Sequence, residues 1–140
     1  MKLSSKIRPA PFWLELYNKG SKAKGQVIFN KIYLKKDIYE NLLKKNPDPI
    51  NVGILLHEQE HVGRIKNEGW LIWNFKYIFL SDFRLKEELA ADKARFTYYK
   101  KKKVNFDLVK RAKDLSSWVY FWPAPYENIK RKLQEVWEKS

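Results

Sequence analysis

The sequence predicts a single, mostly helical α+β domain. One helical pattern runs from Pro49 to Gly69 and is apolar on two sides, which indicates a buried central helix. A second long helical pattern follows from Phe83 to about Lys102, and β-prone residues precede both patterns in the range 26–34. A chain of 140 residues with 16% aromatic side chains suits one domain with one core rather than a disordered protein.

The composition limits the compartment and the partners. The chain has no cysteine, which excludes a disulfide scaffold and fits a reducing, cytoplasmic compartment. Residues 1–11 lack the apolar region of a signal peptide, and the most apolar run, 69–80, is too short and too polar to span a bilayer. The net charge of +13 favours anionic partners such as nucleic acid, although the lysines are spread along the chain as on an ordinary solvated surface.

The N-terminal third predicts short elements. Residues 1–11 form an extended lead-in, and 12–17 form an apolar segment of ambiguous type that Asn18-Lys19-Gly20 interrupts. A flexible basic loop at 21–25 precedes the β-prone residues, which form either a tight hairpin about Asn30-Lys31 or one bent strand. A short helix at 38–45 completes this part of the chain.

The central helix has clear start and stop signals. Asp48 can cap it, Pro49 suits its first position, and Gly69 is a plausible C-terminal cap. Gly63, on the side of Leu56, is expected to admit a close neighbour.

The segment Trp70 to Leu80 is rich in Trp, Phe and Ile and has two interpretations. It is either a patch for a membrane interface or a second core helix, and the small chain favours the core helix. Ser81-Asp82 then predicts an N-cap for the helix from Phe83. Further helices are expected at 106–118 and 126–138, separated by a break at Pro123-Ala124-Pro125.

The central helix carries His57-Glu58-Gln59-Glu60-His61, which reads H-E-x-x-H. Residues four apart share a helical face, so His57 and His61 can present two imidazoles to one metal ion. Glu58 is offset by about 100°, which lets it reach a water on the metal as a general base. Zinc suits this pattern because it takes a third protein ligand and leaves a fourth position for water. Both histidines of the chain lie in the motif, and no thiolate competes with them.

The third ligand is expected among the acids downstream of the motif, which are Asp82, Glu87, Glu88 and Asp92. Glu88 and Asp92 lie one turn apart on one face of the second long helix. Glu88 can therefore ligate the metal while Asp92 accepts the other ring N–H of a ligand histidine. Arg95 shares this face, where it can organise the site or contact a substrate carbonyl.

His57-Glu58-x-x-His61, followed 27 residues later by Glu-x-x-Ala-Asp, resembles the gluzincin clan of zinc metallopeptidases, and in length its minimal members, the minigluzincins. The resemblance covers about residues 26–103 of a single domain and leaves the C-terminal helical extension, 104–140, unexplained. It implies a zincin-like fold with a glutamate helix and one Zn²⁺ ion held by His57, His61 and Glu88. Glu58 would be the general base and acid, and Asp92 the hydrogen-bond partner of His57. It further implies a metalloendopeptidase that holds a peptide or protein substrate in extended form along an edge strand within 26–34. A metzincin is excluded, because Asn67 stands where its third histidine would be.

The sequence departs from the family where the oxyanion is stabilised. Many gluzincins use a downstream His or Tyr, but no further His exists here, so Arg95 or a tyrosine must act. Tyr99 lies about 16 Å from Glu88 along the helix axis, and Tyr120 or Tyr126 would have to fold back. Minimal gluzincins can also be latent, and the Trp/Pro-rich tail from Trp118 is the candidate block.

Two other functions compete with the peptidase. The charge suggests a basic nucleic-acid-associated zinc protein, or a protease that acts on DNA-bound proteins. The motif can also be accidental in a helical module without enzymatic activity.

Overall fold

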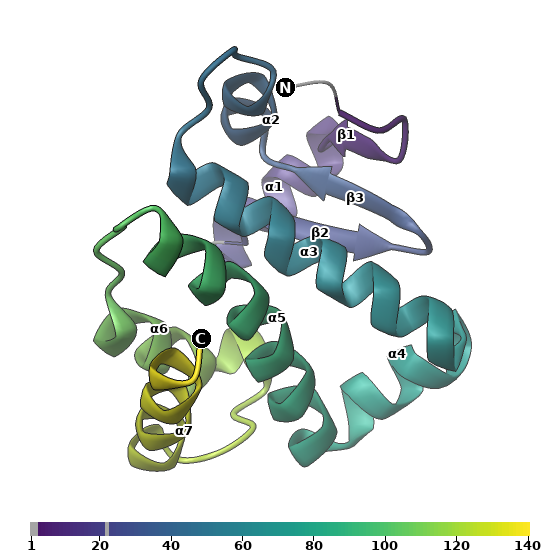
Figure 1. Cartoon of the computed structure of the whole chain (residues 1–140). Coiled ribbons are helices and arrows are strands. Elements are labelled where there is room, and N and C mark those ends of the chain that lie inside the picture. Colours follow the sequence, from purple (N-terminus) through teal and green to yellow (C-terminus); the bar gives the residue numbers. More distant parts are fainter. Residues whose placement is uncertain (1–2, 22) are drawn as a thin grey trace.

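A computed structural model of the chain describes residues 3–21 and 23–140 (Figure 1). Residues 1–2 of the predicted lead-in and Lys22 of the predicted basic loop lie outside these described residues. The fold is mostly helical with one small sheet, which confirms the predicted α+β class. Its elements in chain order are β1 (Ile7–Pro9), α1 (Phe12–Ser21), β2 (Gly25–Ile28), β3 (Lys31–Leu34), α2 (Lys36–Leu42), α3 (Pro49–Glu68), α4 (Trp70–Phe79), α5 (Ser81–Lys101), α6 (Leu108–Leu115), the 3₁₀ helix η1 (Trp118–Tyr120) and α7 (Tyr126–Glu138). Within the described part of the chain, no helix combines the length and apolar character that a bilayer crossing requires.

The sheet has three strands in the order β1-β3-β2, so β2 is an edge strand. β2 and β3 pair antiparallel, and the pairing of Ile28 with Lys31 leaves Phe29 and Asn30 as the loop. This confirms the hairpin, with its turn one residue earlier than predicted, and Phe29 adopts a positive φ of 56° there. Residues 7–9, expected to be a lead-in, instead pair parallel with β3 as β1.

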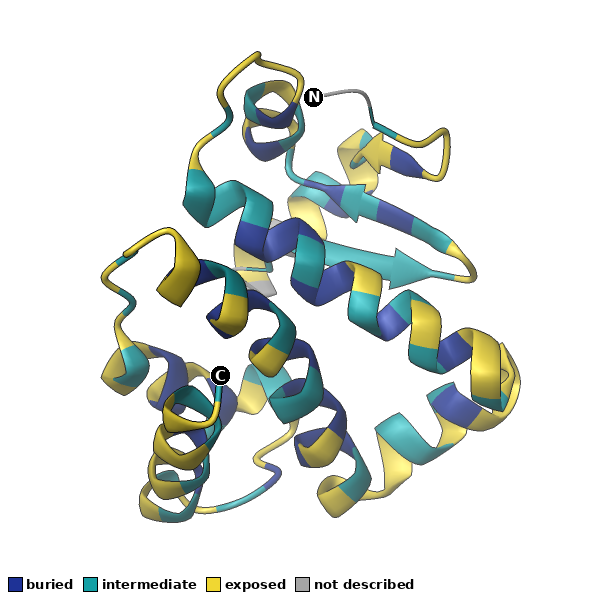
Figure 2. Ribbon diagram, in the orientation of Figure 1, coloured by how far each residue is buried: buried dark blue, intermediate teal, exposed yellow. Residues whose placement is uncertain are grey.

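Helix α3 keeps the bounds that its capping residues predict. The Asp48 carboxylate accepts the Ile50 N–H at 2.8 Å, Pro49 begins the helix, and Gly69 ends it with a φ of 89°. The helix lies between the sheet and α5 (Figure 1) and is buried along both sides (Figure 2). One apolar cluster joins the sheet, α2 and α3, and a second joins α5, α6 and α7. The H-E-x-x-H motif therefore lies on the central, buried helix α3.

The close contact between α3 and α5 occurs at Gly53, and the prediction for Gly63 is wrong. A Cβ atom on Gly53 would lie 2.1 Å from Cε1 of Tyr99, whose hydroxyl donates to the Ile50 carbonyl at 2.9 Å. Gly63 is exposed, and a Cβ atom there would meet nothing within 4 Å. Gly53 faces the neighbouring helix, whereas Gly63, nearer the C-terminal end of α3, faces open space.

Several boundaries differ from the sequence expectations. Helix α1 runs through the expected break at 18–20, and α5 begins at Ser81 without a side-chain cap, so the predicted Ser81-Asp82 cap is wrong. The helix expected at 106–118 is shorter, because Asp107 caps α6 by accepting the Lys110 N–H at 2.9 Å and a 3₁₀ turn replaces its end. Helix α7 has the predicted bounds.

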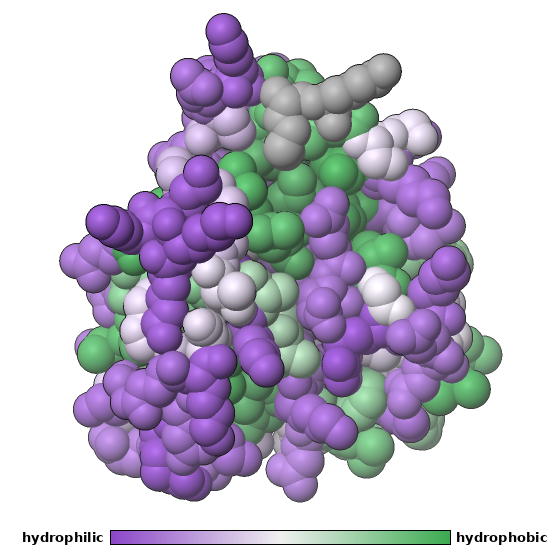
Figure 3. Space-filling view, viewed as in Figure 1, coloured by the Kyte–Doolittle hydropathy of each residue, from purple (hydrophilic) through white to green (hydrophobic). Residues whose placement is uncertain are grey.

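Helix α4 forms as a helix but is not part of the core, contrary to the expectation of a second core helix. Only Trp73 is buried, while most of its other apolar side chains are exposed. The helix contacts α3 and α5 along one side, and hydrophobic side chains show at this edge of the molecule among hydrophilic ones (Figure 3). Among the described helices and strands, only α3 and α5 make substantial contacts with α4, and Phe29 of the β2–β3 loop stacks on Trp70 at its start, so most of the outward side is left uncovered.

Candidate metal centre

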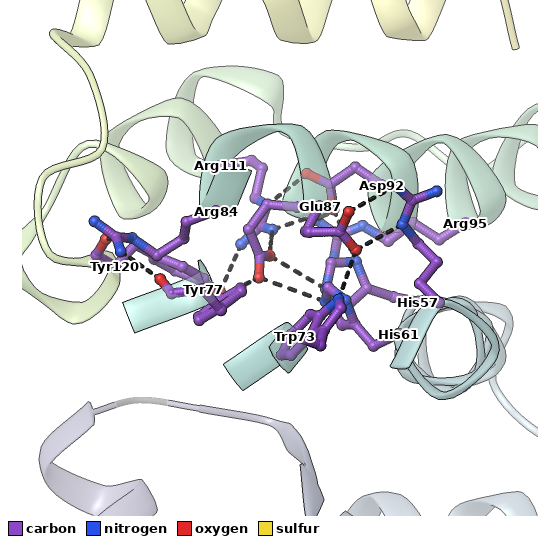
Figure 4. A network of polar contacts seen from close by, with 12 residues as sticks. His57, His61, Trp73, Tyr77, Arg84, Glu87, Asp92, Arg95, Arg111 and Tyr120 are labelled. Atoms are coloured by element: carbon purple, nitrogen blue, oxygen red, sulfur yellow. Dashed lines mark hydrogen bonds and ion pairs between the residues drawn. The ribbon is translucent and has the colours of Figure 1, made fainter. Parts of the chain in front are cut away.

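The predicted ligands converge from two helices. His57 and His61 of α3 and Glu88 of α5 are all buried, and one ligand atom from each lies within 4.8 Å of the other two. Nε2 of His57 is 3.4 Å from one Glu88 oxygen, and Nε2 of His61 is 3.4 Å from the other. Figure 4 shows both imidazole rings directed at the polar network on α5.

The donor set fits a divalent ion of the zinc type. Donor atoms that share one tetrahedral ion at about 2.1 Å lie roughly 3.4 Å apart. Each Nε2 lies 3.4 Å from one oxygen of Glu88, that of His57 from Oε2 and that of His61 from Oε1. Two imidazoles and one carboxylate are a combination that zinc accepts, with a fourth position left for water. The group can therefore hold a metal ion.

Asp92 lies where the sequence predicted it. Its Oδ1 is 2.9 Å from Nδ1 of His57, so it orients the ring whose Nε2 faces Glu88. Arg95 contacts the same oxygen at 2.7 Å, and Nε of Arg111 donates to Oδ2 at 2.8 Å. Burial alone would raise the Asp92 pKa, but the charges of Arg111 and Arg95 outweigh it and hold the pKa well below its usual range. Asp92 is therefore an ionised, rigidly held partner.

The charges at the centre favour a cation. Burial would raise the pKa of Glu88, but His61 and His57 outweigh it and lower the pKa well below its ordinary value. Burial would lower the pKa of His57, but hydrogen bonding to Asp92 and Glu88 raises it above the usual histidine value. Two ionised carboxylates thus favour positive charge at or beside His57, whether it is a proton or a metal ion.

Glu58 lies beside the ligands, between α3 and the edge strand β2. It is buried, and burial raises its pKa despite the nearby imidazoles of His57 and His61. A Cβ atom on Gly25 of β2 would lie 3.0 Å from Oε1 of Glu58, so the glycine admits the carboxylate close to the strand. A carboxylate with a raised pKa is a stronger base than an exposed one.

A cleft reaches the centre from two sides. A first hollow of about 310 Å³ and a second of about 350 Å³ are both lined by Gly25, His57, Glu58, Val119 and Tyr120. The second hollow also takes in His61 and Glu88. Glu58 and the three candidate metal donors therefore face a space large enough for a small ligand or a peptide segment.

The structure adds two residues that sequence reasoning missed, Arg111 in the C-terminal extension and Tyr77 on α4. Arg111 of α6 is buried and donates to Glu88 Oε2 at 2.9 Å and to the Tyr120 hydroxyl at 2.8 Å (Figure 4). The Tyr77 hydroxyl donates to Glu88 Oε1 at 2.5 Å. The sequence contained one indication of the role of Arg111. This arginine lies on the apolar face of α6 with Ala112 and Leu115, and a charged side chain on such a face is usually paired with an opposite charge.

The other candidate acids are placed elsewhere. Glu87 accepts two hydrogen bonds of 2.6 Å from Arg64 and one of 2.9 Å from Trp73 Nε1, and Asp82 is exposed at the start of α5. The Trp73 ring packs edge-on against His61, with 5.7 Å between the ring centroids. Glu87 thus holds the aromatic ring that packs against His61, and Glu88 is the acid that reaches both imidazoles.

Some of the residues predicted to contact an oxyanion or substrate line the hollows, and others do not. Arg95 lines the first hollow, although it also pairs with Asp92. Tyr99 is fully buried against Gly53, and Tyr126 packs on the second apolar cluster, so the structure brings neither of them to the cleft. Tyr120, which the sequence required to fold back, does so and lines both hollows.

Compared with protein-family models, with curated proteins and with solved structures, the chain gives no significant match to any of them. The function is therefore inferred from the residues and their geometry alone.

Proposed function

We propose that this protein is a zinc metallopeptidase of the gluzincin type, built on a minimal zincin-like domain. The single observation that carries the proposal is the convergence of three buried donors, His57, His61 and Glu88, with Glu58 beside them in an open cleft. His57, His61 and Glu88 would hold one Zn²⁺ ion. When bound, zinc would supply Lewis acidity, which polarises a carbonyl and lowers the pKa of water.

Glu58 is the proposed general base and acid. It lines both hollows, and burial raises its pKa above the ordinary glutamate value, which makes it a stronger base. It would take a proton from the attacking water and return it to the leaving amine.

The edge strand β2 is the proposed substrate platform. Gly25, Gln26 and Val27 line the second hollow beside Glu58, and β2 has β3 on one side only. An extended peptide can therefore add to the free edge through main-chain hydrogen bonds. This arrangement would direct a scissile carbonyl to the space between the strand and Glu58.

Tyr120 is the best-placed oxyanion donor in the described chain. Its hydroxyl accepts from Arg111 at 2.8 Å, which fixes the oxygen and leaves the hydroxyl proton to be donated. Burial raises the pKa of Tyr120, so the group stays protonated at neutral pH. A positioned hydroxyl of this kind can stabilise the developing charge on the carbonyl oxygen.

The latency suggested by the sequence stays a prediction. Val119, Tyr120 and Phe121 form a wall of the second hollow, and Tyr120 also holds Arg111 in place. Trimming the tail from Trp118 would remove both this wall and the hydroxyl. We therefore expect truncation to lower activity, and a rise in activity would support a blocking tail.

Zinc analysis of matched variants tests the proposal. Wild type should bind one zinc per chain, and His61→Ala and Glu88→Ala should lose it. Glu58→Gln should keep zinc but cleave a quenched fluorescent peptide about 10² to 10⁴ times more slowly. Glu60→Gln is the control, because Glu60 lies in the same motif but only approaches Arg64 at 3.9 Å. A Glu58→Gln variant as active as Glu60→Gln would refute the mechanism, and zinc retained by Glu88→Ala would refute the ligand set.

The net charge of +13 supports a second candidate, a zinc protein associated with nucleic acid or a protease that acts on DNA-bound proteins. Binding to duplex DNA that weakens steeply with salt would favour it. Absent binding, or binding unaffected by salt, would remove it.

A further inference from the structure

Three segments around the cleft expose large apolar side chains. Their exposed fractions run from 49% to 79%, values typical of residues in open solvent. We call them the apolar rim, and they are Phe12, Trp13, Leu16 and Tyr17 of α1, Leu71, Ile72, Phe75, Ile78, Phe79 and Leu80 of α4 and its end, and Trp118, Phe121 and Trp122 of the tail. Soluble monomers rarely expose so many large apolar groups unless the surface meets a partner.

The three parts of the apolar rim meet at one place. Tyr17, Ile78 and Phe121, one from each segment, line the second hollow. Arg84 ties two of the segments together, since it donates to the carbonyls of Ile78 at 3.0 Å and Tyr120 at 2.7 Å. The guanidinium of Arg84 also lies over the Phe121 ring, 5.3 Å from its centroid. The rim is therefore built into the fold around the mouth of the cleft.

We propose that the apolar rim docks on an anionic lipid bilayer and holds the cleft mouth at the membrane surface. The rim mixes Trp, Tyr and Phe with aliphatic residues, which is the composition of side chains that sit at a membrane interface. Helix α4 has ten residues, too few to cross a bilayer and suited to lying in the interface.

Charge selects the lipid surface over a second copy of the chain. The buried ionic side chains nearly balance, with four carboxylates against three guanidiniums among the described residues, so the net charge of +13 is carried on the surface. Two copies with this charge repel each other, whereas an anionic leaflet attracts each of them. Apolar insertion and electrostatic attraction act together on such a surface.

Binding to vesicles tests the proposal without any metal or substrate, so its outcome is separate from that of the hydrolase assay. In a flotation assay, wild-type protein should rise with vesicles made of phosphatidylcholine and phosphatidylglycerol. Much less of the protein should rise with vesicles of phosphatidylcholine alone. Phe75→Ser with Phe79→Ser, and separately Trp13→Ser with Leu16→Ser, should each weaken binding about tenfold or more. The control pairs Leu43→Ser with Val109→Ser, two exposed apolar residues that lie outside the rim and line neither hollow, and it should bind like wild type.

Near-UV circular dichroism establishes that each variant is folded, and sedimentation measures self-association. Wild-type protein that does not bind the anionic vesicles, or rim variants that bind as tightly as the control, would overturn the proposal. A wild-type dimer that the rim substitutions convert to monomers, without vesicle binding, would overturn it in favour of a second copy of the chain. Quenching of tryptophan fluorescence by brominated lipid in wild type, lost in the rim variants, would support it.

Discussion

Alanine at Gly53 would wedge α3 away from α5 and so test how the metal centre is assembled. A Cβ atom there would lie 2.1, 2.3 and 2.5 Å from Cε1, Cζ and the hydroxyl oxygen of Tyr99. The ring is fully buried and its hydroxyl is bound to the Ile50 carbonyl, so it cannot turn aside without losing that bond. Overpacking typically costs about 1–3 kcal/mol, and an overlap this deep belongs at the upper end. Alanine has a better helix propensity than glycine, which offsets about 1 kcal/mol of this cost. The free energy of unfolding should therefore fall by about 2 kcal/mol.

Urea unfolding followed by tryptophan fluorescence measures this loss, and Gly63→Ala is the control on the same helix. A Cβ atom on Gly63 meets nothing within 4 Å, so this substitution should stabilise the protein by about 0.5–1 kcal/mol. Gly53→Ala should also weaken zinc binding, because separating the helices carries Glu88 away from the imidazoles. Tyr99→Leu should cost less in the Gly53→Ala background than in wild type, since it removes the clash. If Gly53→Ala proves as stable as Gly63→Ala, the close helix contact at Tyr99 does not exist.

Four further results are expected. Asp92→Asn should lower zinc affinity about 10- to 100-fold in a chelator competition, and unchanged affinity would contradict its role in holding His57. Zinc at 100 times its dissociation constant should stabilise wild type by about 2.7 kcal/mol in urea unfolding, an effect absent from Glu88→Ala. Tyr120→Phe should lower kcat about 10²-fold with zinc content unchanged, and a full rate would assign the oxyanion to another donor. Burial raises the pKa of Tyr99 to about 12 and that of Tyr77 well above its usual value, against about 10 in the unfolded chain. The stability that these two buried, neutral tyrosines contribute is therefore fully present below pH 10 and is lost as the pH rises toward 12. An alkaline absorbance titration in which every tyrosine of the folded protein ionises near pH 10 would contradict this prediction.

Much of the secondary structure could be predicted from interactions between residues that are close in the sequence. Asp48, Pro49 and Gly69 specify the ends of α3 through groups within a turn of each end, so the bounds of this helix follow from the sequence. The two strands of the hairpin follow from their β-prone residues, although the sequence left a single bent strand as the alternative, and α7 follows from its helical apolar period. Helical spacing likewise put His57 and His61 on one face.

The sequence by itself thus determined the fold class, the central helix and the donors on it, because these depend on neighbours within a few residues. The sequence predicted Glu88 as the third donor, but its approach to both imidazoles depends on the packing of α5 against α3, which turns the adjacent Glu87, about 100° away around the helix, towards Arg64 and Trp73 instead. Only the tertiary structure decided that Gly53 rather than Gly63 admits the neighbouring helix, and that Arg111 braces the site from beyond the recognised motif. These outcomes depend on which elements meet in space, and residues far apart in the chain carry no local signal of their contact.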